Sequence, residues 1–491
     1  MRPKTYCNPL PIADIPSGRW LDVSMTKEDP RSMPDYRSIS DPSVVYHEGK
    51  WILYPSYAVA YVSTDLVHWQ HVDIGVPHLR YSPAVVQFRG KWYLSGHGMP
   101  EVYVADDPLG PFSLCGYLTD TKGNRMAALD GCYLADTQED GEHLYFYWHG
   151  SRMPKEGDPD VECICGTWGA ELCPDEPWRL RTEPVWINEF DPGRTWQCIG
   201  EHNENGRMGW IEGQWMTKIG GRYYLLYSGC GTEYSSYANG VAISTEGPLS
   251  GFVNQKNHDP FTEKRSGLLR GAGHGCIVPG PGGTYWTFYT SIFCYNHKYE
   301  RRIGMDPVGI DEDGELYCPA VTEVPQYAPG VLPHPERGND AGLVPVTFLR
   351  RPYASSAMPG REPIYAVDDS VLTWWQPCPA DADKTIVIPL ERNTGFLVSA
   401  VRLIWRDIGM ETLDGILPGP FRYVIEYAPD HTQATWRTAV DASTNDQDLC
   451  IDYRTFEPVV AYALRLRIVG TPTGIEPGLV SLTAFGTYNK Q

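Results

Sequence analysis

Three carboxylates stand at comparable places in a phrase that this sequence repeats. Asp41, Asp130 and Glu212 each precede a glycine-centred turn that is followed by an alternating aromatic and aliphatic run. Carboxylates brought together without basic neighbours repel one another, which raises the pKa of at least one of them. One protonated and one ionised carboxyl are what hydrolysis of a glycosidic bond requires, since one donates a proton and the other activates water. Single Asp-Pro or Glu-Gly pairs also occur in ordinary turns. The hypothesis of a catalytic site therefore depends on the equivalent placement of the three carboxylates in the repeats.

The phrase occurs five times in the first 300 residues, beginning at Tyr46, Gln87, Thr137, Thr217 and Val278. Each copy has the pattern of a β-hairpin. Counting eight residues back from the turn glycines at 49, 90, 220 and 282 gives Asp41, Ser82, Glu212 and His274. The remaining copy has a longer turn, and Asp130 precedes its glycine, Gly141, by eleven residues. We predict that these five residues occupy one equivalent position around a ring.

Strand repeats 40 to 80 residues apart are typical of a β-propeller, whose blades surround a central channel. Five hairpins predict five blades within residues 1–324, with further strands in 60–69, 102–112 and 240–252 on their outer sides. The innermost strands of a propeller present their ends to one mouth of the channel. The five equivalent residues should therefore meet there.

The composition changes after the predicted propeller. Residues 325–345 are rich in Pro and Gly, which indicates a linker or a strap over a domain surface. Residues 346–491 alternate again as strands without the repeated phrase, for example in 400–405, 421–427 and 463–469. At this size a single β-sandwich is the economical prediction, so the fold class is all-β throughout.

The bulk properties exclude several classes of partner. A formal net charge of −20 argues against nucleic acid or an anionic membrane. No apolar run approaches a membrane span, and no leader-like segment opens the chain, so we expect a cytoplasmic enzyme. The 13 cysteines lack zinc spacing and are expected to be reduced. Aromatic residues make up 12%, which fits both β-sheets and sugar binding.

Four segments centred on the counted residues, in this order, resemble the signatures of glycoside hydrolase family 43. They are Ser40-Asp41-Pro42, Leu129-Asp130-Gly131, Ile211-Glu212-Gly213 and Gly273-His274-Gly275. Further similarity lies in Asn8-Pro9-Leu10, in 63–69 and in 301–307. The resemblance covers residues 5 to about 320, and it implies a five-bladed propeller that hydrolyses glycosides with inversion.

The resemblance also implies roles. Asp41 would be the general base, Glu212 the general acid, and Asp130 the residue that keeps Glu212 protonated and oriented. Inversion requires acid and base about 6.5–9.5 Å apart, with water between base and sugar. Glu201 and Glu204 are the reserve candidates for the acid.

Other residues would contact the sugar by the same resemblance: Tyr81, Ser82, Trp215, His274 and Arg301. His274 would lie near the channel axis, beside a Ca²⁺ ion or a water cluster; a purely structural histidine is the alternative. For Arg302 we expect an ordinary surface charge. Tyr81-Ser82-Pro83 stands where many relatives have Trp-Ala-Pro, so the sugar subsite should differ in shape.

The run from Ala366 to Trp375 resembles the opening of discoidin-like (coagulation factor type C) β-sandwiches, jelly rolls that include carbohydrate-binding modules. Trp374 and Trp375 could form a sugar platform, but in this motif we expect them in the core. Packing against the propeller, shaping its pocket or mediating oligomers are equally open roles for the domain.

Taken together, these features predict an exo-acting glycosidase that removes a terminal α-L-arabinofuranose or β-D-xylose from plant-type oligosaccharides. A galactose- or galactofuranose-releasing enzyme of the same family is one alternative, and a non-catalytic carbohydrate-binding propeller is another. The motifs Trp-Met-Asn-Asp and Arg-Asp-Pro of the related sucrose- and fructan-cleaving clan are absent. The oligomeric state is not specified by the sequence.

Overall fold

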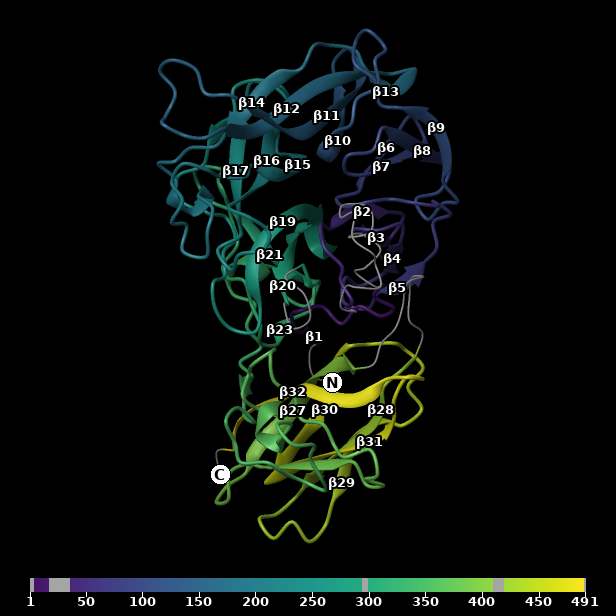
Figure 1. Cartoon of the computed structure of the whole chain (residues 1–491), viewed down its shortest axis with the longest axis vertical. Coiled ribbons are helices and arrows are strands. Elements are labelled where there is room, and N and C mark those ends of the chain that lie inside the picture. Colours follow the sequence, from purple (N-terminus) through teal and green to yellow (C-terminus); the bar gives the residue numbers. More distant parts are fainter. Residues whose placement is uncertain (1–3, 17–35, 294–298, 409–418, 490–491) are drawn as a thin grey trace.

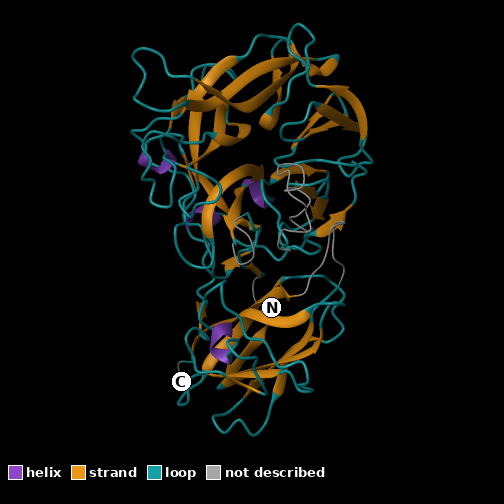
Figure 2. Ribbon diagram, viewed as in Figure 1, coloured by secondary structure: helices purple, strands orange, loops and turns teal. Residues whose placement is uncertain are grey.

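The alternating runs form strands in the computed structural model, which describes residues 4–16, 36–293, 299–408 and 419–489 (Figure 1). Strands and loops make up almost all of the chain in Figure 2. The helices among the described residues are single 3₁₀ turns: η2 (Thr195–Gln197), η3 (Pro281–Gly283), η4 (Pro335–Arg337) and η5 (Pro363–Ala366). In this part of the chain, no helix is long and apolar enough to cross a membrane. The fold is all-β, as predicted.

Five antiparallel sheets follow one another along the first two thirds of the chain. The first contains β2 (Ser43–His47), β3 (Lys50–Tyr54), β4 (Ala60–Ser63) and β5 (Gln70–Val72). The second contains β6 (Ala84–Phe88), β7 (Lys91–Ser95), β8 (Glu101–Ala105) and β9 (Ser113–Tyr117). The third contains β10 (Leu129–Gln138), β11 (Gly141–Arg152), β12 (Ile164–Cys173), β13 (Glu176–Leu180) and β14 (Val185–Glu189). The fourth contains β15 (Glu212–Ile219), β16 (Arg222–Gly229), β17 (Ala238–Ser244) and β18 (Val253–Asn254). The fifth contains β19 (Arg270–Pro279), β20 (Tyr285–Ile292), β21 (Arg301–Ile310) and β22 (Leu316–Tyr317).

The five sheets are the blades of a propeller. Their first strands contact one another in cyclic order, from β2 through β6, β10 and β15 to β19, which returns to β2. Figure 1 shows the same order around a common centre. The ring is closed, so its first strands have neighbours on both sides and the ends of all five meet at the channel.

Aromatic side chains fill the spaces between blades. Trp69 of the first blade packs edge-on against Phe288 of the fifth, with ring centroids 5.9 Å apart, and both side chains are buried. Edge-to-face pairs of this kind stabilise a core beyond the area they bury. The aromatic composition therefore serves the packing of the sheets.

The segment rich in Pro and Gly joins the two parts of the molecule. Within it β23 (Gln326–Tyr327) pairs with β1 (Thr5–Tyr6) near the start of the chain. It then reaches β24 (Val344–Pro345), which pairs with the last strand, β32 (Glu476–Tyr488).

Two further antiparallel sheets form the C-terminal β-sandwich, drawn below the propeller in Figure 1. One has the order β24, β32, β27 (Phe396–Ile408) and β30 (Ile451–Ala461). The other has the order β25 (Tyr353–Ala354), β26 (Thr385–Pro389), β31 (Ala463–Gly470), β28 (Arg422–Ala428) and β29 (Arg437–Ala442). Trp375 and Trp405 are fully buried in its core, where Trp405 stacks on Phe421 at 4.7 Å.

The sandwich and the propeller share buried residues. One apolar cluster contains Leu10 and Phe293 of the N-terminal part together with Ile404, Ile451 and Val480 of the sandwich. Beside it, a cleft of about 1110 Å³ separates the outer strands of the first blade from residues 446–455.

Arg302 lies close to the same contact. Its side chain is only 1% exposed, so the sequence-based expectation of a surface charge is wrong. The docking of the sandwich covers it, with Arg302 Nη2 3.7 Å from Cys450 Sγ.

Candidate active site

Each blade begins with the same irregularity. One or two residues before the regular pairing of its first strand, the backbone adopts a positive φ of 41° to 63°, at Asp41, Ser82, Asp130, Gly213 and His274. Such a conformation is strained for residues other than glycine and is found where surrounding structure enforces it. In the third, fourth and fifth blades the register places one extra residue at this point, as in a β-bulge. Four of these five positions carry a side chain, and the fourth blade has Gly213 there.

The structure corrects one of the five predicted equivalences. Glu212 pairs with Ser228 as Leu129 pairs with His149, so Gly213, not Glu212, corresponds to Asp130. The fourth turn contains two glycines, and Gly221 (φ 82°) takes the conformation that Gly49 (φ 83°) has in the first blade. Eight residues before Gly221 is Gly213, so counting from Gly220 gave a position one residue too early. Glu212 therefore reaches the mouth from the neighbouring backbone position.

Asp41 is held by hydroxyl groups. Ser56 Oγ and Ser40 Oγ donate to Asp41 Oδ2 at 2.5 and 3.0 Å, and the Asp41 side chain is buried. Its backbone N–H donates to Thr290 Oγ1 of the fifth blade at 2.8 Å. This bond crosses the closure of the ring, so the position of Asp41 depends on the whole propeller.

Asp130 forms an ion pair with a residue of the second blade. His97 Nδ1 lies 2.7 Å from Asp130 Oδ1, and the backbone N–H of Gly213 donates to Oδ2 at 3.3 Å. Burial would raise the pKa of Asp130, but the charge and hydrogen bond of His97 outweigh it and bring this pKa below its usual range. Burial likewise opposes the charge on His97, yet Asp130 raises the pKa of that imidazole.

Glu212 has the opposite electrostatic environment. Burial raises its pKa to about 8, together with the negative charge of Asp130 and, more weakly, that of Asp41. Tyr237 Oη donates to Glu212 Oε1 at 2.8 Å and opposes the shift. At neutral pH the site thus contains a protonated Glu212 near an ionised Asp130. The repulsion predicted between the carboxylates thus adds to burial in raising the pKa of Glu212.

His274 bridges two blades. Its Nδ1 lies 3.3 Å from Asp41 Oδ1, and its Nε2 lies 3.1 Å from Ser82 Oγ. Its backbone N–H donates to Ser228 Oγ at 2.6 Å. A Cβ at Gly213 would stand 2.9 Å from His274 Cγ, so glycine is needed for the imidazole to lie there.

A calcium ion at His274 is poorly matched by these contacts. Both ring nitrogens already face protein oxygens, and Ca²⁺ prefers six to eight oxygen ligands. Within the described ranges, no group of three or more His, Cys, Asp or Glu residues could hold a metal ion. The side chains present do not fit a protein-ligated calcium site.

The other predicted sugar contacts lie around this centre in different ways. The Tyr81 carbonyl accepts from the His97 N–H at 3.0 Å, and the two rings meet edge-on. Arg301 is buried and donates to Thr232 Oγ1 at 3.2 Å. Trp215 packs against an apolar cluster that joins the fourth and fifth blades, and against the cluster shared by the propeller and the sandwich. Its contact with sugar stays a prediction.

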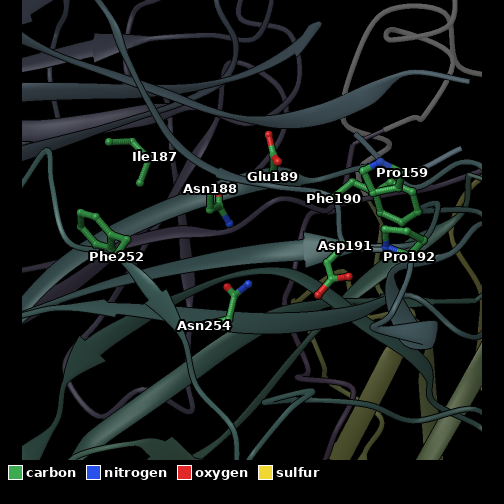
Figure 3. A pocket seen from close by; sticks show the side chains of 9 residues that line it. All are labelled: Pro159, Ile187, Asn188, Glu189, Phe190, Asp191, Pro192, Phe252 and Asn254. Carbon is green, nitrogen blue, oxygen red and sulfur yellow. The ribbon is translucent and has the colours of Figure 1, made fainter. Parts of the chain in front are cut away.

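The reserve acids are both exposed. Glu201 accepts from the Ser235 N–H at 3.0 Å and Glu204 from the His202 N–H at 2.9 Å, both in the loop before β15. A pocket of about 310 Å³ on the third and fourth blades, lined by Asn188, Glu189 and Asp191 among others, contains none of the predicted residues (Figure 3).

Sequence reasoning missed His97, Tyr237 and Ser56. Two of them had a signal, since an equivalent place in each blade, in or just after its second strand, is occupied by Ser56, His97, His149, Ser228 and Thr290. Four of these bond to the start of the next blade: His97 to Asp130, His149 to the Ile211 carbonyl, Ser228 to His274 and Thr290 to Asp41. Tyr237 lies in a loop and had no such signal.

A propeller whose mouth combines one neutral and two further buried carboxyl groups is the architecture of a propeller glycoside hydrolase. The family model described as Glycosyl hydrolases family 43 matches residues 36–316, more than half of the chain. The protein therefore belongs to glycoside hydrolase family 43 and is a glycoside hydrolase.

One solved structure shows the same fold, and two more are similar to the chain. A thermostable family-43 glycoside hydrolase is 20% identical with a TM-score of 0.50, over 66% of this chain and 99% of that one. A protein described as a glycoside hydrolase is 19% identical with a TM-score of 0.49, over 91% and 97%. The family 43 protein BlXynB of Bacillus licheniformis is 15% identical with a TM-score of 0.47, over 99% and 100%. No curated protein matches the chain.

Proposed function

We propose that this enzyme is an inverting exo-glycosidase that releases terminal pentose, α-L-arabinofuranose or β-D-xylose, from plant-type oligosaccharides. The observation that carries the acid–base part is the separation of protonation states at the mouth. Glu212 keeps its proton up to a pKa of about 8, while the pKa of Asp130 is lowered. A carboxyl group that stays protonated at neutral pH beside an ionised one is what a general acid in this site requires.

In the proposed reaction Glu212 is the general acid and Asp41 the general base. Asp41 accepts a proton from a water molecule as the water oxygen attacks the anomeric carbon. The glycosidic C–O bond breaks on the opposite face, and Glu212 gives its proton to the departing oxygen. One water is consumed, and the configuration at the anomeric carbon inverts.

Asp130 and His97 support the acid in this proposal. The negative charge of Asp130 favours the protonated form of Glu212, and His97 keeps Asp130 ionised. The Tyr237 hydroxyl donates to Glu212 Oε1 and so stabilises the carboxylate that remains after proton transfer.

Substrate contacts complete the proposal. Tyr81, Ser82, His274, Arg301 and Trp215 are assigned to the sugar subsite. Tyr81 and Ser82 are the residues expected to set the preference for one sugar, because Tyr81-Ser82-Pro83 stands where many relatives have Trp-Ala-Pro.

The test compares hydrolysis of 4-nitrophenyl α-L-arabinofuranoside, β-D-xyloside and β-D-galactofuranoside by wild type, Glu212→Ala and Asp41→Ala. Each substitution should lower kcat by about 10²–10⁴ on the preferred glycoside. Glu201→Ala, in the loop before β15, is the matched control and should retain activity. A wild type inactive on every glycoside, or two fully active variants, contradicts the proposal.

Leaving groups separate the two roles. Nitrophenol departs without much protonation, so Glu212→Ala should lose less activity on nitrophenyl glycosides than on the corresponding disaccharides. Asp41→Ala should lose similar activity on both, since water attack is impaired in each. The anomer first formed, observed by NMR, tests inversion. Preferential release of galactofuranose would replace the pentose assignment but keep the mechanism.

A further inference from the structure

The segment that leads to Asp41 is tied to the sandwich. Four residues before Asp41, the Arg37 guanidinium binds the carboxylate of Asp448 with two bonds, Nη1 to Oδ2 at 2.7 Å and Nη2 to Oδ1 at 3.0 Å. Asp448 lies between β29 and β30, 411 residues away in sequence. Both side chains are at least 97% buried. Bidentate pairs fix orientation as well as distance.

The same segment is anchored on its other side by β21 of the fifth blade. Arg302 Nη1 donates to the Arg37 carbonyl at 2.8 Å, and the Arg301 N–H donates to Ser38 Oγ at 3.0 Å. The Ile39 N–H donates to the Arg301 carbonyl at 3.3 Å. The residues from Arg37 to Asp41 are thus held between the fifth blade and the sandwich.

Asp448 is itself held in place. Its carbonyl accepts from the Asp14 N–H at 3.0 Å. Arg302, besides holding Arg37, faces Glu300 Oε1 at 3.6 Å. Two cations, Arg37 and Arg302, therefore meet two anions, Asp448 and Glu300, out of contact with solvent. Removing one member of such a group leaves an uncompensated buried charge, which is far more disruptive than losing a surface pair.

The sandwich does not offer Trp374 or Trp375 as a sugar platform. Trp375 is fully buried, and the Trp374 ring has Arg361 and Arg406 at 3.3 and 3.9 Å from its centroid. Guanidinium groups at those distances cover the faces that a sugar would need. The sandwich instead contacts the propeller, through Asp448 and Cys450.

We propose that Asp448 is a positioning residue for the active site: through Arg37 it fixes the segment that carries Asp41, so the sandwich is part of the catalytic unit. The general-base role of Asp41 in this inference rests on the proposed function. Asp448 does not touch substrate. It acts by setting where the Asp41 carboxylate stands relative to the attacking water.

Kinetics give the first test, with Asp448→Asn and Arg37→Lys in the full chain. Asn keeps the shape and one acceptor but loses the charge; Lys keeps the charge but loses the second bond. A small displacement of a reacting group costs on the order of 10²-fold in rate. We expect kcat to fall about 10- to 100-fold while KM changes little. Tyr453→Phe is the matched control, because it removes another bond between the domains, that of Thr5 Oγ1 at 2.8 Å, and should leave kcat unchanged.

Hydrogen exchange gives a second test that needs no activity. Amides in a peptide spanning residues 36–44 should exchange faster in Asp448→Asn than in wild type or Tyr453→Phe. Faster exchange in an enzyme inactive on every glycoside would sustain the link and remove only the proposed function. Unchanged exchange and unchanged kcat in folded variants would overturn the inference, as would a rise in KM alone. If Asp448→Asn does not fold, Arg37→Lys decides by the same two measurements.

Discussion

The propeller mouth and the core of the sandwich are both buried, but the mouth buries polar groups and the sandwich core buries apolar ones. At the mouth, Asp41, Asp130 and His274 are buried polar groups on strained backbone. In the sandwich, Trp375 and Trp405 are buried apolar rings. Burial in the first region changes protonation, and burial in the second removes apolar area from water. Function and stability are therefore concentrated at different places in one chain.

The contrast extends to backbone strain. Four of the five bulge positions carry a side chain at positive φ, which costs of order 1–3 kcal/mol at each position. Such strain persists because neighbouring blades hold the bulges, for example through Thr290 and Ser228. The sandwich core has apolar packing instead. Substitutions in the two regions should separate stability from catalysis.

The largest effect on stability is expected in the sandwich. Trp375→Ala removes a fully buried ring and should lower the free energy of unfolding by about 3–5 kcal/mol. Chemical denaturation followed by fluorescence measures it. Trp374→Ala is the control; its ring is only partly buried and packs against two guanidinium groups, so the loss should be clearly smaller. Equal losses would contradict the assignment of Trp375 to the core.

Gly213→Ala tests the packing of the mouth. The new Cβ would lie 2.9 Å from His274 Cγ and from Ser228 Oγ, at a φ of 63°. We expect a loss of about 1–3 kcal/mol in stability. We also expect a drop in kcat, because His274 contacts Asp41. Gly221→Ala has a φ of 82° with open space around it, so it measures backbone strain alone. Gly221→Ala should keep full activity, and an equally active Gly213→Ala would show that His274 can shift freely.

Glu212→Gln should stabilise the protein at alkaline pH while abolishing most activity. The folded-state pKa of Glu212 is raised from 4.5 to about 8, so its contribution to stability is present below 4.5 and is lost as pH rises through about 8. Gln does not titrate. Between pH 5 and pH 9 the variant should gain on wild type by at least ~1.4 kcal/mol, the equivalent of one pKa unit. Parallel stability curves, measured by urea unfolding, would contradict the raised pKa.

The smallest effect concerns the pH profile. The proposed acid role requires a protonated Glu212, so kcat/KM should decline above a pH of about 8. The Tyr237 hydroxyl lowers the pKa of Glu212, so Tyr237→Phe should move this decline to higher pH. Tyr227→Phe, which alters a buried hydroxyl bonded to Gln197, is the control and should leave the profile unchanged. A shift to lower pH in Tyr237→Phe would argue that another group governs the decline.

Much of the fold was predictable, because strand alternation and turn chemistry are local. The five hairpins predicted five blades, and the spacing to each turn located Asp41, Asp130 and His274 at one equivalent position. The same counting misplaced Glu212 by one residue, since Gly220 and Gly221 are equally good turn glycines in sequence. Only the pairing of Glu212 with Ser228 decides between them.

The sequence by itself determined which residue types could perform acid–base chemistry and which strands would present them. Tertiary structure decided their protonation, because burial and the charges of neighbouring blades raise the pKa of Glu212 and lower that of Asp130. It also brought His97 and Tyr237 into the site, and it joined Arg37 to Asp448 across 411 residues. These contacts arise only when the ring closes and the sandwich docks, since electrostatic interactions depend on distance in space and not on separation along the chain.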